Sequence, residues 1–379
     1  MAIRRRIRSK TGQMTLSFNW IFVLIAGFMI LLFFVSIIMK QKTISEQKLN
    51  FDVINVMNSI LTGSSVSERT INFVDISGIS EFEIFFQCEI DGGGFKDIFS
   101  EYGIVDAESR IELPIQAIFA LKTIQGTEMI TWSLPYNIPY KVMDALIVTS
   151  TSNKYYVLGG EGSELRKDLE NATTGFNIEF ISDISEVAEA GDAHHIRIID
   201  LTGNSVSGSI PDALLDIDDS KVSAVSLGSS LNNIKFYQKK GSSFQITHTE
   251  AESIPIIMTG DQEKDPALYG ALFSYDDDSY KCSMMKLFKR YQILSEIYQG
   301  KTSEMIAAYE GTNGNDECML YLQEGFNGKN LEDSLSNLNS ELSTCLASGY
   351  DTCTGLSEIA KDIQELNQGL ASDNCEKLY

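Results

Sequence analysis

Hydrophobic and polar positions divide the chain into one long apolar run and a longer patterned region that follows it. The run from Met14 to Met39 contains no charged residue, and basic residues lie on both sides of it. A helix rises about 1.5 Å per residue, so this run can cross a hydrocarbon core of roughly 30 Å. Because it is apolar on every side, lipid explains it better than a soluble core does. We therefore predict a transmembrane helix at residues 13–40.

The flanking charges predict the orientation of this helix. Five basic residues precede the run, and the first acidic residue is Glu46. The positive-inside rule then places residues 1–12 in the cytoplasm and the rest of the chain outside the cell membrane. A cleaved secretory signal is the alternative. Such a signal has an apolar region of about 7–15 residues and ends in a small-x-small cleavage site, and neither fits this run.

Apolar positions continue at near-helical spacing after the run and predict a helical stalk at residues 41–62. The stripe packs against the protein's own domain or against a partner. The turn-forming segment Thr62-Gly63-Ser64-Ser65 then ends the helix. The stripe consists of Ile44, Leu49, Val53, Val56, Met57, Ile60 and Leu61.

The apolar period changes from that of a helix to that of a strand after residue 70. Residues 81–90 alternate and are rich in aromatic and β-branched side chains, which predicts a strand. Residues 115–123 and 128–134 predict a hairpin around Gln125-Gly126, and strand character resumes after Pro139. Because no amphipathic helix interrupts this region, we expect an antiparallel sheet.

A strand-helix-strand unit follows, with strands at 155–158 and 176–182 around a helix at 164–171. Together with the preceding region it forms a mixed α/β ectodomain at residues 70–260, and the pattern leaves open whether this is one subdomain or two. Further strands are expected at 195–200, 222–227, 234–237 and 244–247, before an apolar stretch at 254–258.

The pattern becomes helical again from Asp265 onward, which predicts a C-terminal helical domain at residues 265–379. Leucine and isoleucine repeat at alternating spacings of four and three in residues 331–345 and 356–370, which predicts a helical hairpin. The fold class is therefore α+β: a transmembrane helix, a mixed α/β ectodomain with an antiparallel sheet, and a disulfide-stapled helical hairpin or bundle. A first helix carries the apolar face Met284, Leu287, Phe288, Tyr291, Leu294, Ile297 and Tyr298.

The six cysteines are even in number and lie on the predicted outer side, so we expect disulfides. No Cys-x-x-Cys pair is present, and the cysteines are remote from the histidines, so no metal motif is formed. The predicted helix geometry favours three pairs among the possible connectivities: Cys345 with Cys353, Cys318 with Cys375, and Cys88 with Cys282.

Composition narrows the choice of partners. All 52 acidic residues and 24 of the 30 basic ones lie after Lys40, which gives the predicted ectodomain a net charge of −28. Nucleic acid is excluded as a partner, because binding it requires a basic surface. The acidic surface fits solubility or adaptation to salty or metal-rich surroundings.

The segment Gly12-Gln13-Met14-Thr15-Leu16-Ser17-Phe18, between basic residues and the apolar helix, resembles the class III signal of archaeal type IV pilin-like proteins. It also resembles the start of uncharacterised archaeal single-pass membrane proteins. The resemblance implies that a prepilin-like peptidase cuts between Gly12 and Gln13. Ser17 stands where the pilins carry an acidic residue that contacts a neighbouring subunit.

One glycine-rich segment, Gly159-Gly160-Glu161-Gly162-Ser163, leads from a predicted strand into a predicted helix. Nucleotide-binding folds place phosphate loops at such positions, where free amides can hold an anion. The spacing matches neither the dinucleotide nor the Walker motif, and Glu161 would repel phosphate. An ordinary tight turn, in which Ser163 caps the following helix, is the favoured interpretation.

Other polar residues suggest sites only weakly. His194 and His195 are adjacent and would point to opposite faces of a strand, and His248 has no recognisable partner. Asp216–Ser220 and Asp276–Ser279 are acidic enough for calcium but lack the complete spacing of a calcium loop. Asn171 begins the glycosylation sequon Asn171-Ala172-Thr173.

These patterns favour a single-pass surface protein without enzymatic activity, bound to the lipid bilayer and to protein partners at the cell surface, with no cofactor. Its role would be structural, adhesive or in complex assembly, and a pilin-like role is included. The alternative is a membrane-anchored ligand sensor or enzyme that uses residues 159–163.

Overall fold

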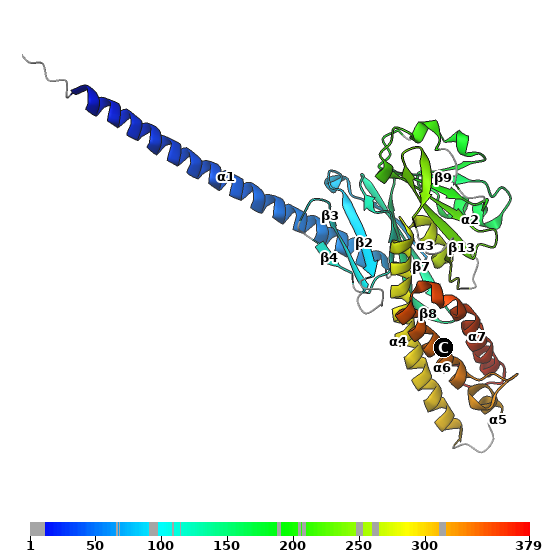
Figure 1. Ribbon diagram of the computed structural model, residues 1–379. Helices are drawn as coiled ribbons and strands as arrows, with labels where there is room; N and C mark the ends of the chain where they lie inside the picture. The colour runs from blue at the N-terminus through cyan, green and yellow to red at the C-terminus, as the bar shows by residue number, and fades with distance from the viewer. Residues whose placement is uncertain are drawn as a thin grey trace, which may run out of the picture.

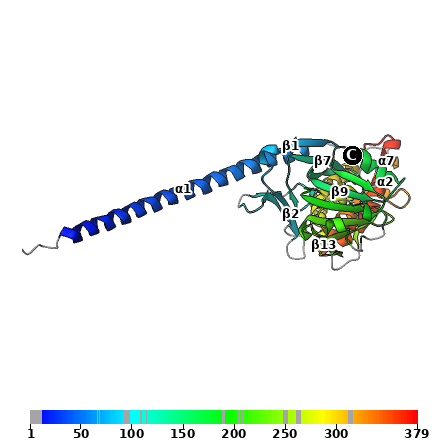
Figure 2. The same cartoon turned by 90° about the horizontal axis from the view of Figure 1, so that it is seen from above.

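In a computed structural model, one long helix, α1 (Gly12–Ser65), projects from a mixed α/β head. Figure 1 shows α1 leaving the head as a single rod, and the perpendicular view in Figure 2 shows it just as extended. The structure describes residues 12–65, 67, 69–90, 98–107, 110–113, 115–187, 191–203, 206, 210–247, 253–259, 265–310 and 316–379.

Among the described residues, one helix is long and apolar enough to cross a membrane, and it is the first part of α1. The span Trp20–Lys42 has 23 residues, and none of its most apolar window is buried in the head. Helix α1 continues without interruption through the expected stalk and ends at Ser65. The apolar span and the stalk are therefore two parts of one helix.

The end of α1 packs against two four-stranded sheets. Sheet A has the order β1-β7-β8-β5, and sheet B has the order β4-β3-β2-β6. All pairs in the two sheets are antiparallel except β5 with β8. The strands of sheet A are β1 (Ile71–Asp75), β5 (Ile118–Ala120), β7 (Glu128–Asn137) and β8 (Lys141–Ser150). Those of sheet B are β2 (Ile84–Ile90), β3 (Ile98–Ile104), β4 (Arg110–Glu112) and β6 (Thr123–Ile124).

The expected hairpin of residues 115–123 and 128–134 is wrong. Strand β5 pairs in parallel with β8, and β6 joins β2 in sheet B. Both edges of β7 are already taken, by β1 and by β8, so the preceding segment has no free edge to pair with. The chain instead crosses from sheet A to sheet B, where Lys122 O accepts a hydrogen bond from Phe86 N at 3.0 Å.

Sheet C is the α/β layer of the head, with the order β10-β9-β11-β12-β13-β14, and β15 also pairs with β13. Strands β10, β9, β11 and β12 are parallel, and helix α2 (Glu164–Ala172) connects β9 to β10. The strands are β9 (Asn153–Leu158), β10 (Ile178–Ile181), β11 (His195–Asp200), β12 (Val222–Leu227), β13 (Asn233–Lys240), β14 (Ser243–Ile246) and β15 (Ile254–Pro255).

The C-terminal part is helical and packs against the sheets (Figure 1). Its α-helices are α3 (Pro266–Phe273), α4 (Asp277–Glu310), α5 (Asp316–Met319), α6 (Leu331–Ser348) and α7 (Leu356–Ser372), with a π-helical turn at Leu320–Glu324. Short 3-10 helices lie at Ser77–Ile79, Ile184–Glu186, Asp212–Leu214, Asp219–Lys221 and Tyr350–Gly355.

One large hydrophobic core joins sheets A and C to the C-terminal helices. Helix α3 lies at its centre, because all eight of its residues are buried. Asp265 caps α3 by accepting hydrogen bonds from Ala267 N and Leu268 N, and Pro266 occupies the first turn. The expected mixed α/β fold with antiparallel sheets is confirmed, and its core is continuous with the helical part.

Candidate functional site

The joint between α1 and the head is the first functional feature, because it attaches the apolar helix to the folded domain. A separate core, shared by sheets A and B, surrounds the last turns of α1. Tyr102 Oη donates to Ile54 O at 3.3 Å, and Ser64 Oγ lies 2.8 Å from Thr131 Oγ1. The helix therefore ends inside the head. Its buried apolar residues are Val53, Ile54, Met57 and Leu61.

The glycine-rich segment 159–163 forms a tight turn and a helix cap. Gly159, Gly160 and Gly162 all have positive φ angles, of 73°, 71° and 80°. A Cβ atom on Gly159 would lie 2.3 Å from the Cγ2 atom of Thr202, so glycine is required there on two grounds. Ser163 Oγ accepts from Arg166 N at 3.2 Å and caps α2.

The position of this turn in sheet C is one that binds ligands in many open α/β sheets. It follows β9, which lies between β10 and β11, where the strand order reverses. Here, however, Arg166 Nη1 donates to Gly159 O at 2.8 Å, and Glu161 lies 3.7 Å from the same guanidinium. The cavities described below are lined by other parts of the chain. The contacts support the turn-and-cap interpretation.

A buried polar network surrounds His195 in strand β11. His195 Nε2 lies 2.8 Å from Ser223 Oγ, and Arg197 Nη1 donates to the same oxygen at 2.9 Å. Histidine and serine can form a catalytic pair, but here His195 is 3% and Ser223 0% exposed. Burial, with Arg197 nearby, lowers the pKa of His195 to about 3, so the ring is neutral. The network is sealed from substrate and is structural.

Arg197 is the central member of this network, and sequence reasoning missed it. Its guanidinium donates to the carbonyl oxygens of Leu272, Ser274 and Tyr275, which lie at the end of α3 and just beyond it. Helix C-termini leave carbonyls without partners, and a cation there also interacts favourably with the helix dipole. Burial lowers the pKa of Arg197 to about 10, so it stays charged at neutral pH. The feature of the sequence that could have indicated this role is the position of a charged residue, Arg197, among the apolar residues of a strand.

His194 has different surroundings from its neighbour. Its Nε2 atom lies 3.1 Å from Thr123 Oγ1 and 3.4 Å from Glu83 Oε1, both at sheet B. Burial lowers the pKa of His194, although Glu83 opposes the shift. This side chain links the α/β layer to sheet B. His248 lies outside the described residues.

The acidic segments have partners within the protein. Asp218 accepts from Ser220 N and Oγ, and Asp219 accepts from Lys239 Nζ at 2.7 Å. Asp276 accepts from Ser279 N at 2.9 Å at the start of α4. Among the described residues, no group of three or more His, Cys, Asp or Glu side chains could hold a metal ion. These segments are caps and ion pairs in the part of the chain that the structure describes.

The glycosylation sequon lies at the end of α2. Asn171 is exposed, as an acceptor asparagine must be, whereas Thr173 is 4% exposed. Thr173 Oγ1 donates to Leu169 O at 2.6 Å. Glycosylation of Asn171 stays a prediction.

Three disulfides join Cys88 to Cys282, Cys318 to Cys375, and Cys345 to Cys353. They are the three pairs that the sequence analysis favoured. The Cys88–Cys282 bond links strand β2 to helix α4 across a sequence separation of 194 residues. The other two lie within the C-terminal helical part and span 57 and 8 residues.

A cavity of about 650 Å³ lies between sheet B and the corner where α3 leads into α4. Its size is typical of sites for small molecules. Two of its aromatic rings form cation–π contacts with basic side chains. The Arg110 guanidinium lies 5.4 Å from the centre of the Phe85 ring, and Lys122 Nζ lies 5.9 Å from the centre of the Tyr275 ring. Its charged lining residues are Glu89, Asp106, Arg110, Lys122, Asp276 and Asp278.

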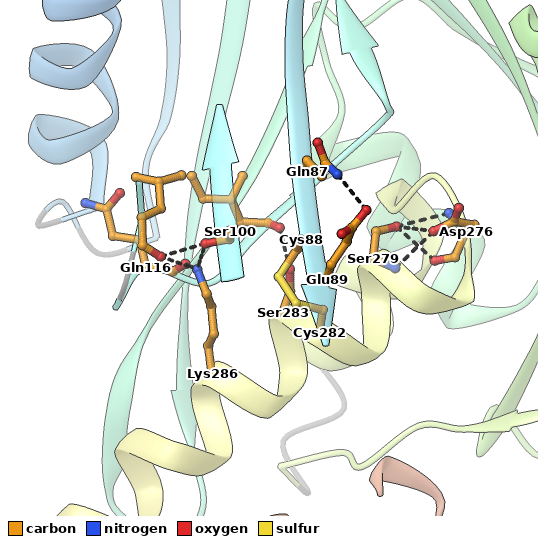
Figure 3. The surroundings of a disulfide bond; sticks show 12 residues. Gln87, Cys88, Glu89, Ser100, Gln116, Asp276, Ser279, Cys282, Ser283 and Lys286 are labelled. Atoms are coloured by element: carbon orange, nitrogen blue, oxygen red, sulfur yellow. Dashed lines mark hydrogen bonds between the residues drawn. A yellow bond between two sulfur atoms is a disulfide. The ribbon is translucent and has the colours of Figure 1, made fainter. Parts of the chain in front are cut away.

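Carboxylates gather beside the disulfide at one end of this cavity. Figure 3 shows Glu89 next to Cys88 on strand β2, with Ser279 of α4 and Asp276, the residue before α4, facing them. Burial raises the pKa of Asp278, and the charges of Asp277, Asp276 and Glu89 add to the shift. This end of the cavity is therefore negative.

Lys286 is buried one helical turn beyond Cys282 (Figure 3). Its ammonium donates to three neutral acceptors, Ser100 Oγ, Leu113 O and Gln116 O. Burial lowers the pKa of Lys286 to about 7. A smaller cavity of about 20 Å³ is lined by both Cys88 and Lys286. Helix α4 thus contacts sheet B through a disulfide and a lysine on one face.

Comparison of the chain with protein families, with curated proteins and with solved structures finds no match. Its function must therefore be inferred from the residues and contacts described above.

Proposed function

We propose that the chain is a single-pass membrane protein whose head lies outside the cell membrane and serves a structural, adhesive or assembly role. The observation that carries this proposal is helix α1. The apolar window of its span Trp20–Lys42 has no residue buried in the head, and its last turns are buried in the core shared by sheets A and B. A helix embedded at both ends, in lipid and in protein, holds the head at a fixed distance from the membrane.

The predicted orientation rests on charge and on the disulfides. The basic residues before the span favour a cytoplasmic N-terminus, and disulfides persist in oxidising compartments outside the cytoplasm. The net negative charge of the head does not suit nucleic acid, so its partners are proposed to be proteins at the cell surface.

Two single-cysteine reporters test the orientation in cells that express the chain. Ser45→Cys lies after the span and Ser9→Cys before it. We expect a membrane-impermeant maleimide to label Ser45→Cys on intact cells. Ser9→Cys is combined with Gly12→Leu, which should block the proposed cut and keep residue 9 in the chain, and it should be labelled only after lysis. The opposite pattern would overturn the proposed orientation. The unmodified chain, with its cysteines paired, is the control for background labelling.

Mass spectrometry of the mature N-terminus tests the proposed processing. A chain that starts at Gln13 supports cleavage by a prepilin-like peptidase, and a chain that starts at Met1 or Ala2 contradicts it. A start beyond Lys40 would identify the helix as a cleaved secretory signal and would overturn the anchor. A Gly12→Leu variant is the matched control, because a large residue before the cut should block processing while the span stays intact.

A further inference from the structure

The three disulfides differ in how far a reactant can reach them. Cys282, Cys345 and Cys353 are 0% exposed, and Cys318 and Cys375 are at most 8% exposed. Cys88 is half-buried and forms part of the wall of the 650 Å³ cavity. Thiol–disulfide exchange requires a thiolate to reach one sulfur of the pair. Cys88 is therefore the least buried of the six cysteines, and it lines the cavity.

We propose that Cys88–Cys282 is a site of thiol–disulfide exchange with a dithiol that enters through this cavity, and that opening it loosens the joint between α1 and the head. The proposal goes beyond the structural role above, and its chemistry does not depend on where the protein is located.

The reaction would proceed in two balanced steps. A thiolate of the dithiol bonds to Cys88 Sγ, the Cys88–Cys282 bond breaks, and Cys282 leaves as a thiolate. The second thiol of the reductant, once deprotonated, then attacks the mixed disulfide and releases the Cys88 thiolate. The two released thiolates take up two protons in total, and the dithiol is oxidised to a disulfide as it supplies two electrons.

Lys286 favours Cys282 as the leaving group. It follows Cys282 by four residues on the same face of α4, and residues at this spacing are neighbours on a helix surface. A nearby cation stabilises a thiolate, and a more stable thiolate leaves faster. The carboxylates of Glu89 and Asp278 at the cavity wall repel the negatively charged thiolate of the incoming dithiol. We therefore expect added salt, which screens exposed charges, to accelerate the exchange.

Opening this disulfide would affect the joint because it is the covalent link between sheet B and α4 in the described part of the chain. The other links described are the hydrogen bonds of Lys286 to Ser100 and to the loop at Leu113 and Gln116, and the packing of Ile90 and Ile98 against the large core. Sheet B in turn supplies Ile84, Tyr102 and Ile104 to the core around the end of α1. A sheet released from α4 would hold α1 less firmly.

The test uses the full chain in detergent micelles at neutral pH, with limiting dithiothreitol, alkylation at timed intervals, and mass spectrometry of each cysteine. We expect Cys88 and Cys282 to be alkylated at least about ten times faster than the other four cysteines. Equal rates for all three disulfides, or faster opening of Cys318–Cys375, would overturn the proposal.

Two further measurements identify the mechanism. With glutathione, a monothiol, the adduct should form on Cys88, and an adduct on Cys282 would contradict the assigned direction of attack. Lys286→Met should slow opening of Cys88–Cys282 several-fold while the opening rate of Cys345–Cys353, which reports that the chain is folded, stays unchanged. Unchanged opening of Cys88–Cys282 would exclude the role of Lys286.

Hydrogen exchange measures the consequence for the joint. After selective reduction, amides of β2, β3 and residues 53–61 of α1 should exchange faster, while those of β11 and β12 should not. Unchanged protection at residues 53–61 would overturn the proposed effect on the joint.

Discussion

Sheets B and C are held in place in different ways, although both belong to one head. Strands β11 and β12 of sheet C are buried along their whole length, and apolar clusters involve residues from both faces of the sheet. Most residues of β2 in sheet B are only half-buried. Sheet B depends on a disulfide, a buried lysine and the end of α1. Strand β3 of sheet B is mostly buried, so the contrast is at β2. A half-buried strand relies on a few specific links, whereas a buried sheet spreads its stability over many contacts.

Replacing Arg197 should have the largest effect, and it tests whether sheet C also depends on a single residue. Arg197→Ala would remove a fully buried cation and leave carbonyls of Leu272, Ser274 and Tyr275 without their donor. We expect the free energy of unfolding to fall by about 3–5 kcal/mol. Denaturant unfolding of the full chain in detergent measures it.

Arg290→Ala is the matched control for this change. Arg290 is exposed on α4, and its replacement should change the free energy of unfolding by less than about 0.5 kcal/mol. Equal effects of the two substitutions would contradict the structural role assigned to Arg197.

Removing the Cys88–Cys282 disulfide should have the next largest effect and should act mainly on sheet B. The double variant Cys88→Ser, Cys282→Ser opens a loop of 194 residues, and we expect a loss of about 2–4 kcal/mol. The control is Cys345→Ser, Cys353→Ser, which opens a loop of only 8 residues and should have a smaller effect. A larger loss of unfolding free energy in the control would show that the length of the closed loop does not determine which disulfide stabilises the protein more.

Lys286 should make the stability of the protein depend on pH. Its pKa is about 7 in the folded state and near its ordinary value of 10.5 when unfolded. Between these values the unfolded chain binds more protons, so the free energy of unfolding should rise with pH. We expect a gain of about 1–2 kcal/mol between pH ~7 and ~9, because each unit of pH contributes at most about 1.4 kcal/mol.

The variant Lys286→Met should lose this slope, since methionine does not titrate. Lys289→Met, which changes an exposed lysine on the same helix, should keep it. Parallel slopes in the wild-type chain and in Lys286→Met would contradict the assignment of the slope to Lys286.

The smallest effect is expected at the turn before α2, outside both sheet cores. Ser163→Ala removes the acceptor for Arg166 N, and loss of such a cap costs about 1 kcal/mol. Ser163→Asp should retain the cap and serve as the control. Thermal unfolding monitored by circular dichroism measures both. A loss above about 3 kcal/mol in Ser163→Ala would point to a role beyond capping.

The sequence predicted the elements of the fold better than their pairing. Alternation located β12 at residues 222–227 and β11 at residues 195–200, where the structure has them. It failed for β5, because local alternation does not reveal which strand edges are free. A strand of three residues that pairs in parallel with β8 carries almost no periodic signal.

The surroundings of Lys286 could not be predicted from a single segment. Lys286 and Ser100 lie 186 residues apart. Met284, Leu287 and Phe288 define the apolar face of α4, and Lys286 lies on the opposite side, which the pattern marks as exposed. Sheet B covers that side. The helix is thus buried on two faces, and only the tertiary structure shows it.

The continuity of α1 makes the helix an angular guide as well as a spacer. Each residue of an α-helix turns the chain by about 100° and advances it by about 1.5 Å. Because α1 runs unbroken from the apolar span into the core of the head, the number of residues between them sets the face that the head presents to its neighbours. One residue added to the stalk would turn the whole head about a quarter of a revolution while barely raising it.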